Sequence, residues 1–168
     1  MGGEADGGVF LIHERIAMFH IVLIEPEIPP NTGNIARTCM VTGSKMHLIR
    51  PLGFDIDDRT LKRSGLDYWQ ELDWCVHDSY EDYMQSPGRR WYFDTPGERC
   101  YAEIEFLPGD HLIFGKETTG LPTDIMDINR DKLLRIPMLQ AARSMNLSNA
   151  VAVVLYEGLR QTGFAGLK

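Results

Sequence analysis

The stretch that decides the fold is FHIVLIEPEIPPNTGNIARTCMVTGSKMHLIR, which spans residues 19–50. It holds a short apolar run at 19–25, a helical segment at 33–42 and a second apolar run at 45–50. Gly43 follows the helical segment, where a glycine is favoured because it adopts the left-handed conformation that ends a helix. Strand, helix and strand in succession are typical of an α/β domain with a largely parallel sheet.

The same alternation continues along the chain and predicts six strands in all. The further strands are expected at 74–77, 90–94, 111–115 and 133–138. Their near-continuous apolar character suits strands that are buried on both faces. Helices are expected at 57–64, 79–85 and 121–129. A last helix is predicted from a stripe of apolar and small residues at helical spacing, namely Leu147, Ala150, Val151, Val154, Leu155 and Gly158.

Length and composition predict one domain over residues 18–168. The chain has 168 residues, of which 43% are hydrophobic, and a net charge of −7 at pH 7. That is enough apolar material for one core, and the acidic charge argues against a broad basic surface for nucleic acid, though not against a local patch. Residues 1–17 are acidic and glycine-rich, and we interpret them as a leader or an added segment before a natural start at Met18. No apolar run approaches the roughly 20 residues that span a bilayer, so no membrane segment is expected.

Cysteine and histidine spacing gives no sign of a metal site. The three cysteines include no CxxC pair, and the five histidines include no HxxxH pair. An odd number of cysteines also disfavours a disulfide framework. The sequence therefore predicts a reduced, cytoplasmic protein without a bound metal.

The common nucleotide-binding and hydrolase motifs are missing. No GxGxxG follows the first strand, and no GxSxG elbow is present. In GDHLIFGK, Gly109 lies one residue too far from Gly115 for a phosphate loop, and Glu117 follows Lys116 where a hydroxyl residue is needed. A small-molecule hydrolase on a similar sheet is also disfavoured as the function, because the sequence shows no pair of nucleophile and base.

Three polar segments follow predicted strands, and ligands of doubly wound sheets gather at those carboxyl ends. The first is EPEIPPNTGNIART, residues 25–38, in which Asn31 or Thr32 is expected to cap the following helix. Arg37 on that helix is either a solvated arginine or a side chain partly buried against a partner chain. In the second case it needs an anionic or hydroxyl partner.

The second segment, HLIFGKETTGLP at 111–122, reads equally well in two ways. It is either a glycine-rich turn with a surface carboxylate or a ligand loop. In the ligand loop, Gly115 and Gly120 let the backbone approach a flat molecule and Glu117 supplies an acceptor.

The third segment is RIPMLQAARSMNLSN, residues 135–149. Ser144, Asn146 and Ser148 can all cap the last helix, but one helix start needs only one or two caps. The surplus of polar residues leaves room for a role in an active site.

Taken together, NTGNIAR, FGKETTGLP and RIPMLQAARSMNLSNAVAVVLYE resemble the three motifs of the SPOUT class of RNA methyltransferases. The run PLGFDIDDRTLKRSGLDYW, residues 51–69, is similar to the minimal TrmL-type members of that class, which methylate the 2′-hydroxyl of the tRNA wobble nucleotide. The similarity covers residues 18–164. It implies a C-terminal trefoil knot in the α/β fold, a homodimer, and S-adenosyl-L-methionine as the methyl donor, with S-adenosyl-L-homocysteine as the product.

The resemblance also implies roles for individual residues. Arg37, Ser144, Asn146 and Glu117 match the catalytic positions. The cofactor site would comprise Phe93, Thr95, Gly115, Ile136, Met138, Ser144, Met145 and Leu147. Because an arginine with a pKa above about 12 is a poor general base, we expect Arg37 to stabilise the developing alkoxide or to anchor a phosphate. No metal is required for this reaction.

Basic residues next to aromatic ones suggest where tRNA binds despite the acidic total charge. The predicted patch comprises Arg59, Lys62, Arg63 and Tyr68, with Arg89 and Arg90 before Trp91 as a second candidate. A solvated helix face with packed aromatic side chains would give the same sequence pattern. Two broader alternatives remain open, namely methylation of another RNA site, such as ribosomal RNA or another tRNA position, and a catalytically silent RNA-binding dimer.

Overall fold

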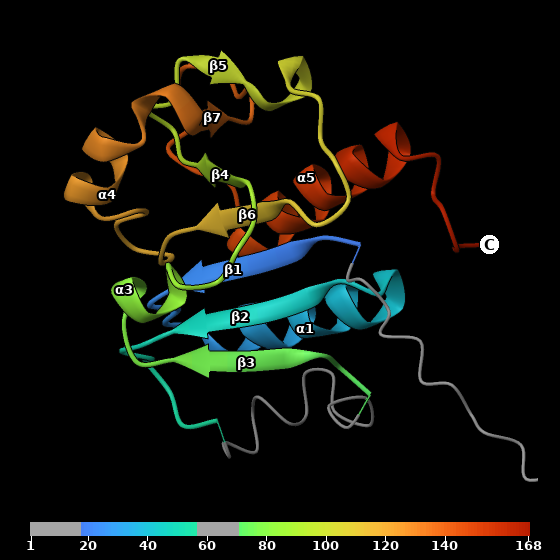
Figure 1. Ribbon diagram of the computed structural model, residues 1–168. Helices are drawn as coiled ribbons and strands as arrows, with labels where there is room; N and C mark the ends of the chain where they lie inside the picture. The colour runs from blue at the N-terminus through green and yellow to red at the C-terminus, as the bar shows by residue number, and fades with distance from the viewer. Residues whose placement is uncertain (1–17, 57–70) are drawn as a thin grey trace, which may run out of the picture.

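The computed structural model describes residues 18–56 and 71–168. Within these ranges the chain forms one sheet in the order β3-β2-β1-β6-β4-β7-β5, and every paired strand is parallel to its neighbour (Figure 1). The strands are β1 (His20–Ile24), β2 (Lys45–Ile49), β3 (Trp74–His77), β4 (Arg90–Phe93), β5 (Arg99–Cys100), β6 (His111–Phe114) and β7 (Leu133–Arg135). The helices are α1 (Pro29–Thr42), α3 (Tyr80–Tyr83), α4 (Thr123–Ile128) and α5 (Leu147–Gln161), with 3-10 turns η2 (Tyr101–Glu103) and η3 (Arg130–Lys132).

Helices cover both faces of the sheet, which explains why the strands read as continuous apolar runs. In β1, Ile21 and Leu23 belong to the core cluster that includes α1 and α5. Val22 and Ile24 point the other way, into a smaller cluster with residues of α3 and α4. Alternate residues of one strand therefore fill two cores.

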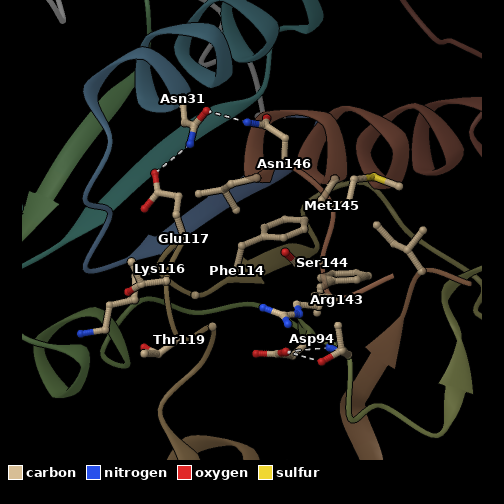
Figure 2. A pocket seen from close by; sticks show the side chains of 18 of the residues that line it. Asn31, Asp94, Phe114, Lys116, Glu117, Thr119, Arg143, Ser144, Met145 and Asn146 are labelled. Atoms are coloured by element: carbon tan, nitrogen blue, oxygen red, sulfur yellow. Dashed lines mark hydrogen bonds between the residues drawn. The ribbon is translucent and has the colours of Figure 1, made fainter. Parts of the chain in front are cut away.

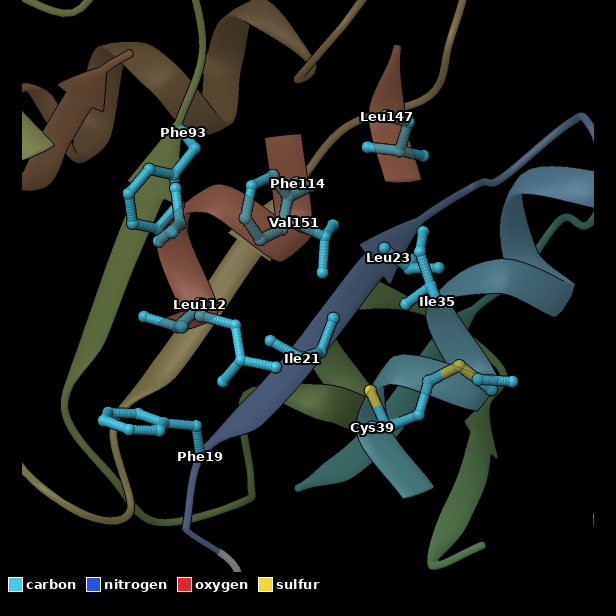
Figure 3. Close-up of a cluster of buried hydrophobic side chains, with 14 of the residues drawn as sticks. Phe19, Ile21, Leu23, Ile35, Cys39, Phe93, Leu112, Phe114, Leu147 and Val151 are labelled. Carbon is cyan, nitrogen blue, oxygen red and sulfur yellow. The ribbon is translucent and has the colours of Figure 1, made fainter. Parts of the chain in front are cut away.

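The larger core lies between the sheet and the pair α1 and α5 (Figure 3). Ile35 and Cys39 enter it from α1, and Leu147 and Val151 from α5. The stripe predicted for the last helix is confirmed, because Leu147, Val151, Val154, Leu155 and Gly158 are buried. These two helices also pack against each other, so the first and last helices of the described chain are neighbours.

The parallel α/β sheet is confirmed, but the prediction of six strands is wrong. The sheet in the described residues has seven, because β5 pairs with β7 at the edge. Two residues are too short to show a period in the sequence, and this strand exists only because β7 lies beside it. The strand predicted at 133–138 ends at Arg135, and the residues that follow it line a cavity instead.

The helix predicted at 33–42 begins four residues earlier, at Pro29. The prediction that Asn31 or Thr32 caps it is wrong, since both lie inside the helix and the N-cap residue is Ile28, which makes no side-chain capping bond. Prolines at the first helical positions are favoured because their missing N–H has no partner there in any case. Gly43 ends the helix with a φ of 68°, as predicted.

The leader predicted at 1–17 and the helix predicted at 57–64 fall on residues that the structure does not describe. Among the described residues, no helix combines the length and apolar character needed to cross a bilayer.

Candidate active site

A cavity of about 570 Å³ opens at the carboxyl ends of β4, β6 and β7, beside the first turn of α5 (Figure 2). The chain segments that follow these three strands, together with the start of α1, supply its walls. Its volume lies within the range of roughly 300–1,000 Å³ that small-molecule sites usually have. Its position at the strand ends is the one expected for a ligand of a doubly wound sheet.

One wall of the cavity is apolar. It is built from Phe93, Phe114, Ile136, Met138 and Leu147. Phe93 and Phe114 stack with their ring centroids 4.9 Å apart, which gives a fixed aromatic surface. Such a wall suits the flat base of a nucleoside.

Glu117, which also lines the cavity, holds the start of α1. Its Oε2 accepts a hydrogen bond of 2.8 Å from the backbone N–H of Glu27, and its Oε1 accepts one of 3.1 Å from the backbone N–H of Ile28. A carboxylate at a helix N-terminus is stabilised by these donors and by the positive end of the helix dipole. The loop between β6 and α4 therefore fixes a helix that lies about 90 residues earlier in the chain.

A chain of side-chain hydrogen bonds links Glu117 to the start of α5 (Figure 2). Asn31 Nδ2 donates to Glu117 Oε1 at 3.1 Å, and Asn31 Oδ1 accepts from Asn146 Nδ2 at 3.0 Å. Asn146 Oδ1 in turn accepts from the backbone N–H groups of Ser148 and Asn149. The amide of Asn31 thus joins the N-terminal ends of two helices, and both ends face the cavity.

Two glycines allow the loop after β6 to fold tightly. A Cβ atom on Gly115 would lie 2.0 Å from the carbonyl carbon of Gly120, so the lack of a side chain serves a close crossing of backbone. Gly120 has a φ of 72°, and a Cβ there would lie 2.2 Å from Asp94 Oδ2. That same oxygen accepts a 2.7 Å hydrogen bond from the backbone N–H of Leu121. Asp94 therefore ties the end of β4 to this loop.

Lys116 is the cation of this loop. Its Nζ lies 2.8 Å from Glu25 Oε2, and this bond raises the pKa of Lys116. The contact joins the end of β1 to the end of β6. This loop is therefore held by a charge pair as well as by backbone contacts.

The structure brings together most of the residues singled out from the sequence. All eight residues expected to form a cofactor site line this one cavity, namely Phe93, Thr95, Gly115, Ile136, Met138, Ser144, Met145 and Leu147. Glu117 and Asn146 also line it. Arg37 does not, because it is exposed on α1, nearly two turns beyond Asn31. Arg59, Lys62, Arg63 and Tyr68 lie outside the described residues.

Sequence reasoning missed several residues of the cavity. Asp94 is the last residue of a predicted strand, and its place at a carboxyl end could have marked it. Asn31 was read only as a helix cap. The second candidate for a tRNA-binding patch, Arg89 and Arg90, makes hydrogen bonds within the chain. Arg89 donates to both carboxylate oxygens of Asp110 at 2.8 and 2.6 Å, and Arg90 donates to backbone carbonyls. These bonds engage both guanidinium groups inside the chain.

The family model described as the SpoU rRNA Methylase family matches residues 18–156. A tRNA (cytidine(34)-2′-O)-methyltransferase of Saccharophagus degradans is 53% identical over 156 residues, which cover 90% of this chain and 100% of that relative. A solved structure that concerns the 2-OH methylation of C/U34 on tRNA is 44% identical with a TM-score of 0.83, over 88% of this chain and 98% of that one. The SpoU methyltransferase AviRb from Streptomyces viridochromogenes, solved with AdoMet, is 25% identical with a TM-score of 0.79, over 90% of this chain and 60% of that one.

Proposed function

The chain belongs to the SpoU methylase family of the SPOUT class, and from this premise we propose that it is a tRNA 2′-O-methyltransferase that acts on the wobble nucleotide, position 34. The observation that carries the proposal is the cavity at the strand ends, because it joins an apolar wall to the polar residues of all three sequence motifs. Relatives that share 44–53% identity over nearly the whole chain bear the position-34 name or subject. This favours tRNA over ribosomal RNA as the substrate.

The cavity fits S-adenosylmethionine by its chemistry. When bound, this cofactor supplies a methyl group activated by a positively charged sulfur. Phe93, Ile136, Met138 and Leu147 would contact the adenine, while Thr95, Ser144 and the backbone at Gly115 and Met145 would serve its polar parts. The product, S-adenosylhomocysteine, would leave from the same cavity.

In this proposal the polar residues of the cavity orient the attack on the methyl group. Ser144 is exposed at the cavity edge and would contact the ribose or pass its hydroxyl proton to water. Glu117 and Asn146 would hold the two helix ends in place, which fixes the reacting groups at the required distance. No metal takes part in this transfer.

Arg37 would act in the cavity of a second copy of the chain. It carries a charge suited to a developing alkoxide or a phosphate, yet it is absent from the residues that line the cavity of its own chain. Exposed apolar residues on the adjacent helices α1 and α5, Val41, Val153 and Tyr156, support a homodimer through this side of the molecule. Such a dimer would carry Arg37 to the cavity of the partner.

We also propose that the segment 136–146 threads through the loops after β4 and β6 as a trefoil knot. The support is local: a Cβ on Gly97, in the segment after β4, would lie 2.5 Å from the backbone of Leu134 in β7. Backbone segments that cross without room for a methyl group are expected where a chain is threaded tightly. Tracing the chain in a crystal structure tests this.

The enzyme would act in the cytoplasm, where tRNA is found.

The activity is tested with purified protein, S-adenosylmethionine and tRNA transcripts, followed by mass spectrometry of the nucleosides. We expect 2′-O-methylation of nucleotide 34 and none when that nucleotide is 2′-deoxy. Incorporation that is unchanged by the 2′-deoxy substitution, or that occurs only on ribosomal RNA, would contradict the proposal. Arg37→Ala should lower kcat about 100-fold while S-adenosylmethionine binding is kept, and Arg130→Ala serves as the control.

Mixed dimers decide whether Arg37 acts across the interface. Arg37→Ala chains are mixed with Met138→Trp chains, in which the indole fills the cavity. If Arg37 serves the partner, half of the dimers hold one complete site, and activity returns to about one quarter of the wild-type value. If Arg37 serves its own chain, no mixture regains activity.

A further inference from the structure

A second cluster of reactive side chains lies away from the cavity, on the face of the sheet that α3 covers. It comes from four adjacent strands and contains His20, His47, Cys75, His77 and His111. Cys75 and His47 are partners in the register of β2 and β3, and His77 lies two residues beyond Cys75 on the same face of its strand. None of these residues lines the cavity.

Three atoms of this cluster form a compact triangle. His47 Nδ1 lies 2.9 Å from His77 Nε2, and Cys75 Sγ lies 3.2 Å from the first and 3.3 Å from the second. We propose that His47, Cys75 and His77 form a zinc-binding site, with two imidazole nitrogens and one thiolate as ligands and a fourth position open to water. Cysteine and histidine are the ligands that Zn²⁺ prefers in proteins.

The triangle has nearly the size that a tetrahedral zinc site needs. Zinc bonds of roughly 2.3 Å to sulfur and 2.0–2.1 Å to nitrogen separate the ligand atoms by roughly 3.3–3.6 Å. The observed separations reach these values if the side chains move by a few tenths of an ångström. His47 is buried, while Cys75 and His77 are partly exposed on the edge strand, so that an ion has a route of entry.

Both histidine ligands have a partner for the ring nitrogen that faces away from the triangle. His77 Nδ1 lies 3.5 Å from Asp82 Oδ2, and His47 Nε2 lies 2.9 Å from His20 Nδ1. Metal-binding histidines usually donate this second N–H to a carboxylate or another acceptor, which orients the ring and selects the tautomer. Such partners on both rings would orient the two imidazoles toward a metal.

The alternative set of His20, His47 and His111 is less suited to a metal. His111 Nδ1 lies 2.6 Å from the hydroxyl of Tyr83, and the ring also bonds to the backbone of Pro87. Both nitrogens of His111 are therefore engaged. His20 then serves as the outer acceptor of His47, and the ring of His111 stacks on it with the centroids 4.2 Å apart.

Zinc binding would release one proton. The Cys75 thiol gives up its proton to solvent, and the thiolate forms the bond to zinc. His77 would bind zinc through Nε2 and keep its proton on Nδ1, from which it donates a hydrogen bond to Asp82. Binding would add a further link between β3 and β2 and would stabilise β3, which lies at the edge of the sheet formed by the described residues.

The CxxC and HxxxH spacings describe ligands on a helix or in a short turn, whereas the ligands proposed here come from neighbouring strands. The informative signal is Cys75 and His77 at i and i+2, since this spacing places two side chains on one face of a strand. His47 joins them only through the register of the sheet.

The test uses the full chain, stripped of metal with a chelator and then titrated with Zn²⁺ in competition with a chromophoric chelator. We expect one Zn²⁺ per chain and about one proton released. Co²⁺ in place of zinc should give a thiolate-to-metal charge-transfer band. Cys75→Ser should abolish the band and weaken zinc binding by more than about 100-fold, whereas Asp82→Asn should weaken it roughly 10-fold.

Cys100→Ser is the matched control, because Cys100 is also partly buried but lies on β5 at the other edge of the sheet. It should bind zinc like the wild type. Urea unfolding without metal should give similar midpoints for both cysteine variants, and Zn²⁺ should raise the midpoint of Cys100→Ser but not that of Cys75→Ser. Zinc uptake well below one per chain, or equal uptake by the two variants, would overturn the proposal.

Discussion

The N-terminal ends of α1 and α5 face the same cavity, but they are held in opposite ways. α5 is capped by its own residue, since Asn146 accepts from the backbone of Ser148 and Asn149. α1 has no local side-chain cap and begins with two prolines. The backbone N–H groups of Glu27 and Ile28, just before its first residue, are bound by Glu117 from a distant loop. The first helix end depends on the tertiary fold, whereas the second is encoded locally.

This difference has a consequence for the site. Because α1 is held from the loop after β6, any change in that loop moves the start of α1 and, through Asn31, the start of α5. A change at Asn146 should act more locally, on its own helix. A substitution at Glu117 should therefore disturb both helix ends, whereas one at Asn146 should disturb mainly the start of α5.

The largest effect is expected for Gly115→Ala. The added methyl group would overlap the backbone of Gly120 and Leu121, and backbone cannot move aside as a flexible side chain can. We expect a loss of about 3 kcal/mol in the free energy of unfolding, measured in urea, and no detectable S-adenosylmethionine binding by calorimetry. Gly109→Ala is the control, because its φ is also positive but no atom lies within 4 Å of the added Cβ. It should cost about 1 kcal/mol.

Glu117→Ala should come next. It leaves the backbone donors of Glu27 and Ile28 and the amide of Asn31 without their acceptor. We expect a loss of about 2 kcal/mol in unfolding free energy and clearly weaker cofactor binding. Glu117→Gln keeps an acceptor oxygen and should lose less than half of that amount. Equal effects from the two variants would show that the carboxylate does not hold α1.

Asn146→Ala removes a local cap and should cost about 1 kcal/mol, as N-cap substitutions usually do. Asn146→Asp keeps the capping oxygen but loses the donor to Asn31, so it should retain most of the stability. Amide hydrogen exchange distinguishes the two kinds of cap. Faster exchange in Asn146→Ala should be confined to the first turn of α5, and a spread into α1 would contradict the local cap.

The smallest expected effect is the coupling between the two helix ends. Glu117 and Asn146 do not touch, but both bond to Asn31. A double-mutant cycle of Glu117→Ala and Asn146→Ala should therefore give a coupling of about 0.5 kcal/mol. The same cycle in an Asn31→Ala background should give none. A coupling that survives without Asn31 would mean that the ends communicate through the packing of α1 against α5.

Much of the candidate site could be read from the sequence because its parts follow strands. Ser144, Met145 and Leu147 lie at a helix start with a clear apolar stripe, and Glu117 lies three residues after the end of a buried strand. Asp94 and Asn31 were missed, since their roles depend on partners far away in the chain. The histidine and cysteine cluster was missed for the same reason, as its members are brought together only by strand register.

The sequence by itself determined the alternation of strands and helices, the buried stripe of α5, the polar cap before it and the glycine end of α1, because each depends on neighbours within about one helical turn. Only the tertiary structure decided where α1 begins, that Arg90 bonds within the chain, and that β5 exists. It also placed the eight expected cofactor residues, which come from three segments of the chain, around one cavity. These features depend on contacts between segments far apart in the chain, and no local pattern of residues records which distant partner supplies the missing hydrogen bond.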